Sequence, residues 1–505
     1  MLKKIVSVCL AACLVCAGCA LAEEGSFVSY HSDFSAGTDG WYARSAGGAA
    51  VSVTEEGLKI TGRTASWNSP WRDFPLQAGK EYALSVRVRQ ESQATANFMI
   101  SVAHSKAGTE SYENLATGAA KKGEWTTVAG TWTPGEYDNY ILYVETAGSD
   151  TLDFTIADFT VELNEVRLAQ DDPSLKEAFA PWFLLGTAVT QGEALNTQRM
   201  DAYSYHFGIY TPGNELKPDS VLDVAASMRL AKEDDTAVAV RFDAAKPLLS
   251  YCRDHGLPVH GHVLVWHSQT PEAFFHKGYK ASAEYVTRET MLARLDNYIR
   301  QIMAFMDQNY PGLIVSWDVV NEAIDDSTGQ LRQSNWTKVV GDDFVERAFE
   351  IARKYAPKDV KLYYNDYNTP IAPKTDGILA LLARLTAEGN IDGYGFQAHY
   401  SATSPAPSRI RAAMEQVEAL GLRVRISELD VTIDGNTELN LKVQAIRYAD
   451  LFKIFMEHAE HLDAVQLWGV SDDLSWRASQ YPLLFDRLLK PKPAFHSVLE
   501  LATAE

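Results

Sequence analysis

Two glutamates that follow apolar, strand-like runs stand out for their chemistry in this 505-residue chain. The first run, residues 314–320, leads into Asn321 and Glu322, and a second run, residues 423–427, leads into Glu428. A carboxylate at the end of a buried strand costs desolvation energy unless the site uses its charge. Two facing carboxylates can cleave a glycosidic bond, because one protonates the leaving oxygen while the other faces the forming oxocarbenium ion. We therefore predict that Glu322 and Glu428 form a carboxylate pair.

The residues around Glu428 predict how the pair divides its roles. Two nearby carboxylates do not both ionise easily, so one of them keeps its proton. Asp430 follows Glu428 by two residues, and His399 ends the neighbouring predicted strand. A relay from Glu428 through His399 to Asp430 would hold Glu428 ionised, as a nucleophile requires, and would leave Glu322 as the acid and later the base. The alternative for each glutamate taken alone is a buried ion pair.

Strand-like runs alternate with amphipathic helical stretches from Leu175 onward, which indicates repeated β–α units and a parallel sheet. Eight such runs predict a (β/α)8 TIM barrel of the α/β class, in which catalytic groups lie at the carboxyl ends of the strands. The charged stretch Asp219–Arg241 is predicted to be an insertion. The predicted strands are Phe183–Val189, Gly208–Thr211, Pro258–Trp266, Leu313–Asn321, Val360–Asn365, Gly393–His399, Arg423–Leu429 and Ala464–Gly469.

Several kinds of partner are excluded by the same sequence. No glycine-rich phosphate loop precedes a helix, so we predict no nucleotide cofactor. His260 and His262 alternate along a predicted strand and should face opposite sides, and His-Glu-x-x-His is absent, so we predict no catalytic metal. Asp and Glu outnumber Lys and Arg by 66 to 46, a balance that repels phosphate backbones and anionic membranes. No nucleic-acid partner is expected, and we expect a monomer.

Residues 25–168 have a different pattern, with short alternating segments separated by Gly, Asn, Asp and Ser clusters. This pattern predicts an all-β sandwich of jelly-roll type. Sugar binding by such a module needs aromatic faces for stacking and a few fixed polar groups. The candidates are Trp67, Tyr112 and Tyr143, with Arg44 and Glu145 as polar partners. The alternative is that most of these aromatic side chains belong to the core.

The first 22 residues have the features of a signal peptide, with a lysine pair, an apolar run and the cleavage site Ala20-Leu21-Ala22. They predict a secreted protein. Alternatively, Cys16-Ala17-Gly18-Cys19 resembles a lipobox, with lipid anchoring at Cys19. The mature chain keeps one cysteine, Cys252, which we expect to be an inert buried thiol in a helix over Ala245–His255. The predicted organisation is a signal peptide at 1–22, a sandwich at 25–168, a linker at 169–174 and a barrel domain at 175–502.

The motifs at the predicted strand ends closely resemble those of glycoside hydrolase family 10, the endo-β-1,4-xylanases. The resemblance covers residues 175 to about 500 and implies a retaining endo-1,4-β-xylanase with Glu322 as acid/base and Glu428 as nucleophile. The motifs, in the family's order, are His262-Val263-Leu264-Val265-Trp266-His267-Ser268-Gln269, Trp317-Asp318-Val319-Val320-Asn321-Glu322-Ala323, Tyr364-Asn365-Asp366-Tyr367-Asn368, Gln397-Ala398-His399 and Ser427-Glu428-Leu429-Asp430.

The same resemblance implies a set of sugar-binding residues near the cleavage point. Asn321 would donate to the sugar 2-hydroxyl, and two tryptophans would wall the sugar faces. The implied residues are Asn214, Lys217, His262, Trp266, Gln269, Asn321, Gln397, His399, Trp468 and Trp476, with Asp430 behind His399. The chain departs from the family at Gly213, where many members have glutamate, and in the insertion at Asp219–Arg241.

The segment Gly57–Pro70 resembles the Thr-Gly-Arg-Thr-x-x-Trp-x-x-Pro segment of the xylan-binding carbohydrate modules of family 22. This resemblance implies that Arg44, Trp67, Tyr112, Tyr143 and Glu145 line a xylan groove. Some modules of this type hold a structural calcium ion, but no clear oxygen-ligand motif assigns one here. The leading hypothesis is therefore a secreted xylanase that binds xylan and xylo-oligosaccharides. Alternatives are a retaining β-glucanase or cellobiohydrolase and a polysaccharide-binding surface protein with an inactive barrel.

Overall fold

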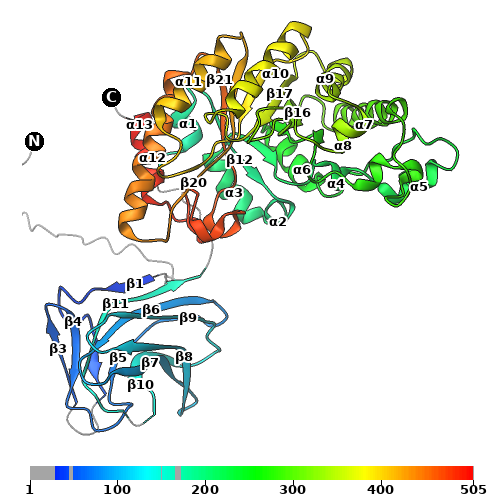
Figure 1. The fold of residues 1–505 in the computed structure, drawn as a ribbon. Helices are drawn as coiled ribbons and strands as arrows, with labels where there is room; N and C mark the ends of the chain where they lie inside the picture. Colours follow the sequence, from blue (N-terminus) through cyan, green and yellow to red (C-terminus); the bar gives the residue numbers. More distant parts are fainter. Residues whose placement is uncertain (1–28, 45–48, 149, 165–171, 504–505) are drawn as a thin grey trace, which may run out of the picture. The chain divides into compact units, whose positions relative to one another are not determined.

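The computed structural model describes residues 29–44, 49–148, 150–164 and 172–503 (Figure 1). The chain forms two compact units, Met1–Glu165 and Val166–Glu505. The predicted signal peptide, with Cys19, lies outside the described residues, as do residues 169–171 of the predicted linker.

The N-terminal unit is a β-sandwich of two antiparallel sheets, as predicted. One sheet has the order β3-β4-β11-β6-β9, with β1 paired to β11, and the other has the order β2-β5-β10-β7-β8. In β6 every second residue from Tyr82 to Gln90 is buried, which places the apolar side chains of this strand between the sheets. The strands are β1 Ser29–Ser32, β2 Tyr42–Ala43, β3 Ala50–Thr54, β4 Gly57–Thr61, β5 Pro70–Asp73, β6 Tyr82–Gln90, β7 Thr95–Lys106, β8 Thr109–Lys121, β9 Thr126–Trp132, β10 Asn139–Thr146 and β11 Phe154–Leu163.

The C-terminal unit contains a parallel sheet that closes into a barrel, which confirms the predicted fold. The strand order is β14-β13-β12-β21-β20-β18-β17-β16-β15, and β14 also pairs with β16 to close the ring. Two of the eight predicted strands are each divided into two short pieces, β14 and β15 in one case and β18 and β19 in the other. The strands are β12 Leu184–Val189, β13 Ile209–Pro212, β14 Val259–Gly261, β15 Val265–Trp266, β16 Ile314–Asn321, β17 Lys361–Asp366, β18 Gly393–Phe396, β19 His399–Ser401, β20 Arg423–Thr432 and β21 Leu462–Leu467.

Helices cover the outside of this sheet (Figure 1). The longest, α7, is capped by the Thr287 side chain and buries Leu295, Ile299, Ile302 and Met303 at the predicted helical spacing. The α-helices are α1 Leu175–Phe179, α2 Gln191–Ala194, α3 Thr197–His206, α4 Pro218–Val221, α5 Val224–Leu230, α6 Lys246–His255, α7 Arg288–Asn309, α8 Asn335–Val339, α9 Phe344–Tyr355, α10 Lys374–Glu388, α11 Pro407–Glu418, α12 Glu438–Glu457 and α13 Pro493–Thr503. Four short 3-10 helices are η1 Glu272–Phe275, η2 Lys277–Tyr279, η3 Asp472–Leu474 and η4 Ala478–Gln480.

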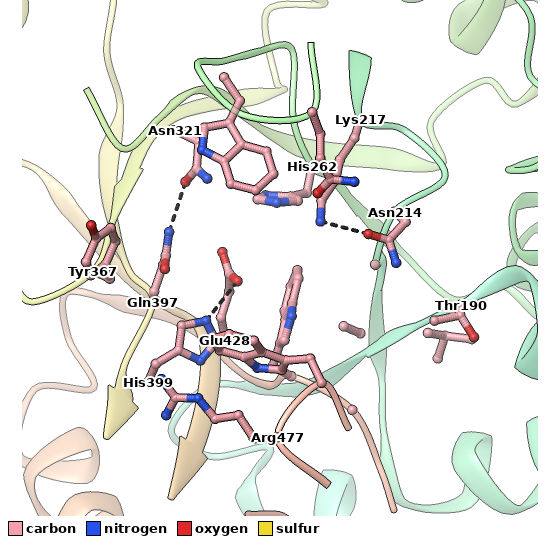
Figure 2. A pocket seen from close by; sticks show the side chains of 18 of the residues that line it. Thr190, Asn214, Lys217, His262, Asn321, Tyr367, Gln397, His399, Glu428 and Arg477 are labelled. Carbon is pink, nitrogen blue, oxygen red and sulfur yellow. Dashed lines mark hydrogen bonds and ion pairs between the residues drawn. The ribbon is translucent and has the colours of Figure 1, made fainter. Parts of the chain in front are cut away.

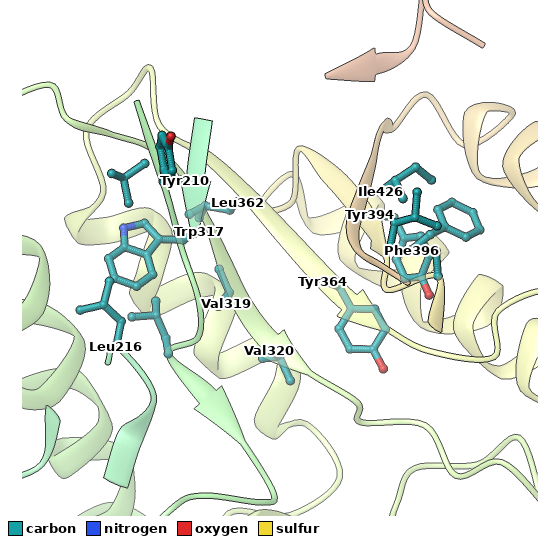
Figure 3. Close-up of a cluster of buried hydrophobic side chains, with 14 of the residues drawn as sticks. Tyr210, Leu216, Trp317, Val319, Val320, Leu362, Tyr364, Tyr394, Phe396 and Ile426 are labelled. Atoms are coloured by element: carbon teal, nitrogen blue, oxygen red, sulfur yellow. The ribbon is translucent and has the colours of Figure 1, made fainter. Parts of the chain in front are cut away.

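Bulky side chains from the strands fill the core around the barrel, part of which Figure 3 shows. Trp317 in β16 is 1% exposed, and its ring lies against the backbone of Gly261 at the end of β14. No side chain fits at position 261, since a Cβ there would overlap the indole of Trp317. This close approach fixes β14 against β16, the strand that leads to Asn321 and Glu322.

Candidate active site

Glu322 leaves the end of β16 with a φ of 57°, in the left-handed region that residues with a side chain seldom adopt. Its carboxylate is held by three N–H donors. Trp266 Nε1 donates to Oε2 at 3.0 Å, while Gln397 Nε2 and Asn321 Nδ2 donate to Oε1 at 2.9 and 3.1 Å. Backbone strain of this kind concentrates at functional sites. The turn therefore fixes the carboxylate in a defined orientation at the carboxyl end of the barrel.

Glu428 lies within β20 and is 5% exposed. Asn365 Nδ2 donates to its Oε1 at 2.8 Å, and His399 Nε2 lies 3.2 Å from its Oε2. The other ring nitrogen of His399 lies 2.8 Å from Asp430 Oδ2. The contacts of the predicted relay from Glu428 through His399 to Asp430 are therefore present.

The relay controls the charges of Glu428 and His399. Burial alone would raise the pKa of Glu428, but the hydrogen bond with His399 and the nearby cationic groups hold that pKa below its usual value. For His399, burial alone would lower the pKa, but the Asp430 and Glu428 carboxylates raise it to about 9. At neutral pH, Glu428 is therefore an anion beside an imidazolium, which is the state that a nucleophilic carboxylate needs.

An amide network joins the two carboxylates. Asn365 Nδ2 donates to Asn321 Oδ1 at 2.9 Å as well as to Glu428, and Gln397 Nε2 lies 3.1 Å from Asn321 Oδ1. Asn365 itself is fixed by Ser427 Oγ, which donates to its Oδ1 at 2.6 Å. Asn365 was not among the predicted site residues, although it lies in one of the strand-end motifs, because the motif alone does not reveal which of its side chains points inward.

A cavity of about 620 Å³ opens at the carboxyl ends of the strands (Figure 2). All of the barrel residues predicted to bind sugar line it together with both glutamates, and Asp430 lies behind His399. The predicted residues in the lining are Asn214, Lys217, His262, Trp266, Gln269, Asn321, Glu322, Gln397, His399, Glu428, Trp468 and Trp476. The cavity has the size of a small-molecule or oligosaccharide site.

Lys217 lies on one side of this cavity. Its Nζ donates to Asn214 Oδ1 at 2.9 Å and lies 5.1 Å from the centre of the Trp266 ring. Burial lowers the pKa of Lys217, although Glu428 and other carboxylates oppose that shift. The ammonium group and the Asn214 amide therefore offer polar contacts beside apolar indole faces, the combination that sugar hydroxyls and sugar rings require.

One prediction about the histidines is wrong. His260 and His262 do not face opposite sides, because His260 Nε2 and His262 Nδ1 both lie 2.9 Å from Asp318 Oδ2. Strand β14 ends at Gly261, so the alternation of a strand does not extend to His262. Asp318 thereby fixes the His262 ring on the wall of the cavity. Among the described residues, no group of three or more His, Cys, Asp or Glu side chains is arranged to hold a metal ion.

Arg477 also lines the cavity and was not predicted. Its Nη1 lies 3.1 Å from Asp430 Oδ1, and Trp476 Nε1 donates to Asp430 Oδ2 at 2.9 Å. The Trp476 ring also lies 5.0 Å from the His399 ring, and the residue is 63% exposed. Asp430 thus anchors the loop after β21 as well as His399. In the sequence, only the position of Arg477 next to Trp476 points to the cavity. Its partner Asp430 is distant in the chain, so the contact could not be predicted.

The predicted insertion begins beside Gln269, which lines the cavity. The Asp219 backbone N–H donates to Gln269 O at 2.9 Å, and Gln269 Nε2 lies 3.3 Å from Asp219 Oδ2. The rest of the segment is fixed by Arg294 on α7, which is fully buried and ion-pairs with Asp235 at 2.6 Å. The segment contains all of α5 and the last three residues of α4, and its first residue contacts Gln269.

The five predicted sugar contacts of the sandwich gather around Arg44. Its guanidinium lies 5.1 Å from the Trp67 ring centre and 5.3 Å from that of Tyr112, and Nη2 donates to the Tyr112 hydroxyl at 2.9 Å. Trp67 and Tyr112 are 39% and 48% exposed and are available for stacking on a ligand. Trp67 and Tyr112 are therefore surface residues rather than core residues.

The other two predicted contacts are buried beneath this surface. Tyr143 is 3% exposed and stacks on Trp71 at 4.5 Å, and Trp71 in turn lies 3.9 Å from the Arg44 guanidinium. Glu145 accepts from Ser101 Oγ at 2.7 Å, and its pKa is raised mainly by burial. The core alternative is therefore correct for Tyr143. Trp71 lies between Tyr143 and Arg44. It was not predicted, because its position in the sequence does not distinguish it from the other aromatic residues of the sandwich.

Cys252 is a free, fully buried thiol in α6, and burial raises its pKa. Such a thiol is a poor nucleophile. Among the residues that the structure describes, no helix is long and apolar enough to cross a membrane.

A parallel barrel with a pair of carboxylates, amides and tryptophans at the carboxyl ends of its strands defines a glycoside hydrolase. Residues 174–501 match glycosyl hydrolase family 10, and residues 28–151 match a carbohydrate binding domain. The chain belongs to glycosyl hydrolase family 10, which confirms the resemblance found in the sequence.

Several curated endo-1,4-β-xylanases are similar to this chain. Endo-1,4-β-xylanase Y of Acetivibrio thermocellus is 32% identical over 512 residues, covering 93% of this chain and 46% of that protein. The bifunctional endo-1,4-β-xylanase XylA of Ruminococcus flavefaciens is 39% identical over 339 residues, covering 66% of this chain and 35% of that protein. The chain thus spans roughly a third to a half of the length of these curated relatives.

A solved structure with both parts is also similar. It contains the CBM22-1 and GH10 modules of an endo-1,4-β-D-xylanase from Clostridium thermocellum in complex with xylohexaose. The sequences are 29% identical, the TM-score is 0.61, and the match covers 94% of this chain and 97% of that one.

Proposed function

We propose that the protein is an endo-1,4-β-xylanase that hydrolyses xylan with retention of anomeric configuration and that the sandwich binds the same polysaccharide. The observation that carries this proposal is the hydrogen-bonded relay that holds Glu428 as an anion in a cavity shared with Glu322. The endo-1,4-β-xylanases among its relatives, and the xylohexaose bound to the similar solved structure, support xylan as the substrate.

The chemistry takes two displacements. Glu428 attacks the anomeric carbon while Glu322 transfers its proton to the leaving oxygen, which gives a covalent glycosyl-enzyme. Glu322, now a carboxylate, removes a proton from water, which then displaces Glu428. We propose that the Asn321 amide donates to the sugar 2-hydroxyl. Because the nucleophile attacks directly, we expect carboxyl groups about 5–5.5 Å apart. No step needs a metal ion or cofactor, and we propose none for the reaction.

Separate variants of the two glutamates test this mechanism. Glu428→Ala and Glu322→Ala should each lower kcat by several orders of magnitude, on the order of 10³-fold or more. Azide should rescue only Glu428→Ala to an α-glycosyl azide, because only that variant leaves room for an anion in place of the nucleophile. NMR of the first products should show the β-anomer, and inverted products would rule out retention.

A second candidate is a retaining β-glucanase or cellobiohydrolase. One relative, which is 31% identical over 507 residues, is named exoglucanase XynX of Acetivibrio thermocellus. Its name supports a glucan as the alternative substrate. The two substrates differ at C5, where glucan carries a hydroxymethyl group. Relative kcat/KM on xylan and mixed-linkage glucan separates them, and a higher value on the glucan would overturn the xylanase assignment.

The predicted export and assembly are also part of the proposal. The lysine pair, apolar run and Ala20-Leu21-Ala22 support secretion, and lipid attachment at Cys19 is the alternative. Mass spectrometry of the mature N-terminus distinguishes the two.

We propose a monomer, which light scattering tests. A structural calcium ion in the sandwich remains an unassigned proposal, for which the measurement is thermal stability with and without a chelator.

A further inference from the structure

Two side chains from outside the catalytic cavity hold the peptide group that joins Glu322 to Ala323. The Ala323 N–H donates to the Tyr364 hydroxyl at 2.9 Å, and Arg332 Nε donates to Glu322 O at 3.1 Å. A left-handed backbone such as that of Glu322 persists only where its surroundings hold it in place. These two hydrogen bonds therefore support the turn that carries the Glu322 carboxylate.

The Tyr364 hydroxyl is oriented by a buried ion pair. It donates to Asp366 Oδ2, and Lys374 Nζ lies 2.7 Å from Asp366 Oδ1. Asp366 is fully buried, and Lys374 is 1% exposed. Two charges in such a place carry a large desolvation penalty, and apolar side chains of similar size often stabilise a fold as well or better. Orientation of Tyr364 gives this ion pair a role that apolar side chains cannot fill.

Lys374 favours the state of Asp366 that accepts hydrogen bonds. Burial raises the pKa of Asp366 to about 6, and the Lys374 ammonium group opposes that rise. An ionised carboxylate can only accept, so the Tyr364 hydroxyl donates to Asp366 and keeps its lone pairs for the Ala323 N–H. A protonated Asp366 can donate to Tyr364 instead, and it would then compete with Ala323 for the same oxygen.

The loop after β16 is also held against α10. Lys374, the first residue of α10, lies 3.0 Å from Asp326 in that loop. A Cβ at Gly377 would overlap a backbone oxygen of the loop, so the two backbones are in direct contact there. Arg332, ten residues after Glu322, lies at the end of this loop and reaches back to the Glu322 carbonyl.

We propose that Tyr364 and Arg332 are positioning residues that hold Glu322 where it can transfer protons to and from the substrate. Asp366 and Lys374 support Tyr364 in this role. The inference rests on the proposed function, because it concerns the residue that serves there as acid and base. If the peptide group after Glu322 is released, the carboxylate moves away from the leaving oxygen, while the nucleophile stays in place on β20.

Substrates with different leaving groups separate an effect on Glu322 from a general loss of structure. Cleavage of xylotetraose needs an acid for the leaving sugar oxygen, whereas dinitrophenolate leaves from 2,4-dinitrophenyl β-xylobioside without one. For Tyr364→Phe, we expect kcat/KM on xylotetraose to fall about tenfold, a part of the ~10²–10⁴-fold that general acid–base catalysis contributes. We expect kcat/KM on the dinitrophenyl substrate to stay within about twofold of its original value.

The second displacement gives a further readout on the dinitrophenyl substrate. Its kcat depends on removal of a proton from water by Glu322, so kcat should fall in Tyr364→Phe although kcat/KM does not. Azide attacks the glycosyl-enzyme without the help of a base. Added azide should therefore restore kcat and give the β-xylobiosyl azide.

Tyr363→Phe is the matched control. Tyr363 precedes Tyr364 in β17, is fully buried, and donates its hydroxyl to Asp463, so this variant also loses a buried hydroxyl bound to a carboxylate. It should change kcat/KM on the two substrates by the same factor. Arg332→Gln loses the donor to Glu322 O and should reproduce the difference between the substrates that we expect for Tyr364→Phe.

The outcomes separate this inference from the proposed function. If the unsubstituted enzyme cleaves neither substrate, the proposed function fails and the inference fails with it. If it cleaves both, but Tyr364→Phe is fully active on both or loses activity equally on both, the inference alone is overturned. The same substrate difference in Tyr363→Phe would also overturn it. If Tyr364→Phe does not fold, Arg332→Gln decides by the same comparison.

Discussion

At the scale of single residues, the charge of Glu428 depends on His399. The imidazole donates to Glu428 and is itself kept protonated by Asp430, with a pKa raised to about 9. Burial alone would push the pKa of Glu428 upward, so the balance between burial and the His399 contact decides whether the nucleophile is ionised.

Replacing His399 with a neutral residue should therefore shift the acid limb of the pH profile. In His399→Asn, the hydrogen bond and positive charge that lower the pKa of Glu428 are lost, so that pKa rises. Activity is lost below this pKa, where Glu428 is protonated, and the acid limb of kcat/KM should move to higher pH. His458→Asn is the control, because His458 pairs with Glu418 rather than with a residue of the catalytic cavity. A limb that stays in place would contradict the relay.

The sequence was sufficient to predict both glutamates and the relay, because each of these residues lies in or just beyond a strand with a clear apolar pattern. It could not predict Asn365 as the residue that contacts both Asn321 and Glu428, since that role depends on three strands meeting. It also placed His260 and His262 wrongly, because the end of β14 at Gly261 is a tertiary feature.

At the scale of elements, the position of β16 depends on its contact with β14. Gly261 leaves room for the buried Trp317 ring, and the residue that follows Trp317 is Asp318, which fixes His262. The carboxyl end of the same strand supplies Asn321 and Glu322. A small error in the β14–β16 contact would therefore be transmitted to several residues of the cavity.

Gly261→Ala tests this dependence. The added methyl group would overlap the Trp317 indole, so we expect a loss of about 1–3 kcal/mol in the free energy of unfolding and a lower kcat. Gly213→Ala is the matched control for stability, because the nearest atom to a Cβ at position 213 is Val189 O at 3.7 Å. Denaturant unfolding measures both. If Gly261→Ala is as stable as the unsubstituted protein, β14 can move away from β16 at no cost in free energy, which would contradict this dependence.

Most barrel strands were predicted within one or two residues, because a buried parallel strand is a continuous apolar run. Strand β8 of the sandwich carries no comparable signal, because its side chains are mostly exposed and its sequence lacks an apolar alternation. The left-handed backbone at Glu322 was also not predictable, since glutamate has no preference for that conformation.

At the scale of the whole molecule, two units with separate cores carry separate sites. The sandwich presents Trp67 and Tyr112 around Arg44, and the barrel contains the catalytic cavity. A binding module linked to an enzyme raises the local concentration of the enzyme at an insoluble substrate, even when the catalytic site is unchanged.

Trp67→Ala in the full chain should therefore affect insoluble and soluble substrates differently. Loss of an aromatic stacking face should weaken adsorption to insoluble xylan about tenfold, equivalent to about 1.4 kcal/mol, while kcat/KM on short soluble xylo-oligosaccharides stays the same. Trp125→Ala is the control, because its ring lies against Arg87 rather than Arg44. Affinity gel retardation of residues 25–168 alone gives a second readout. Equal adsorption of the two variants would remove Trp67 from the proposed sugar site.

The most direct test of the central claim is to trap the covalent intermediate. A 2-deoxy-2-fluoro xylobioside with a good leaving group should glycosylate the nucleophile in the first step and be hydrolysed from it only very slowly in the second. Fluorine destabilises both oxocarbenium-like transition states, and the good leaving group keeps the first step fast enough for the covalent intermediate to accumulate. Peptide mass spectrometry should then find one sugar-labelled peptide, with the label on Glu428 between Ser427 and Leu429. A label on Glu322, or an active enzyme that forms no covalent adduct, would contradict the assignment of Glu428 as the nucleophile.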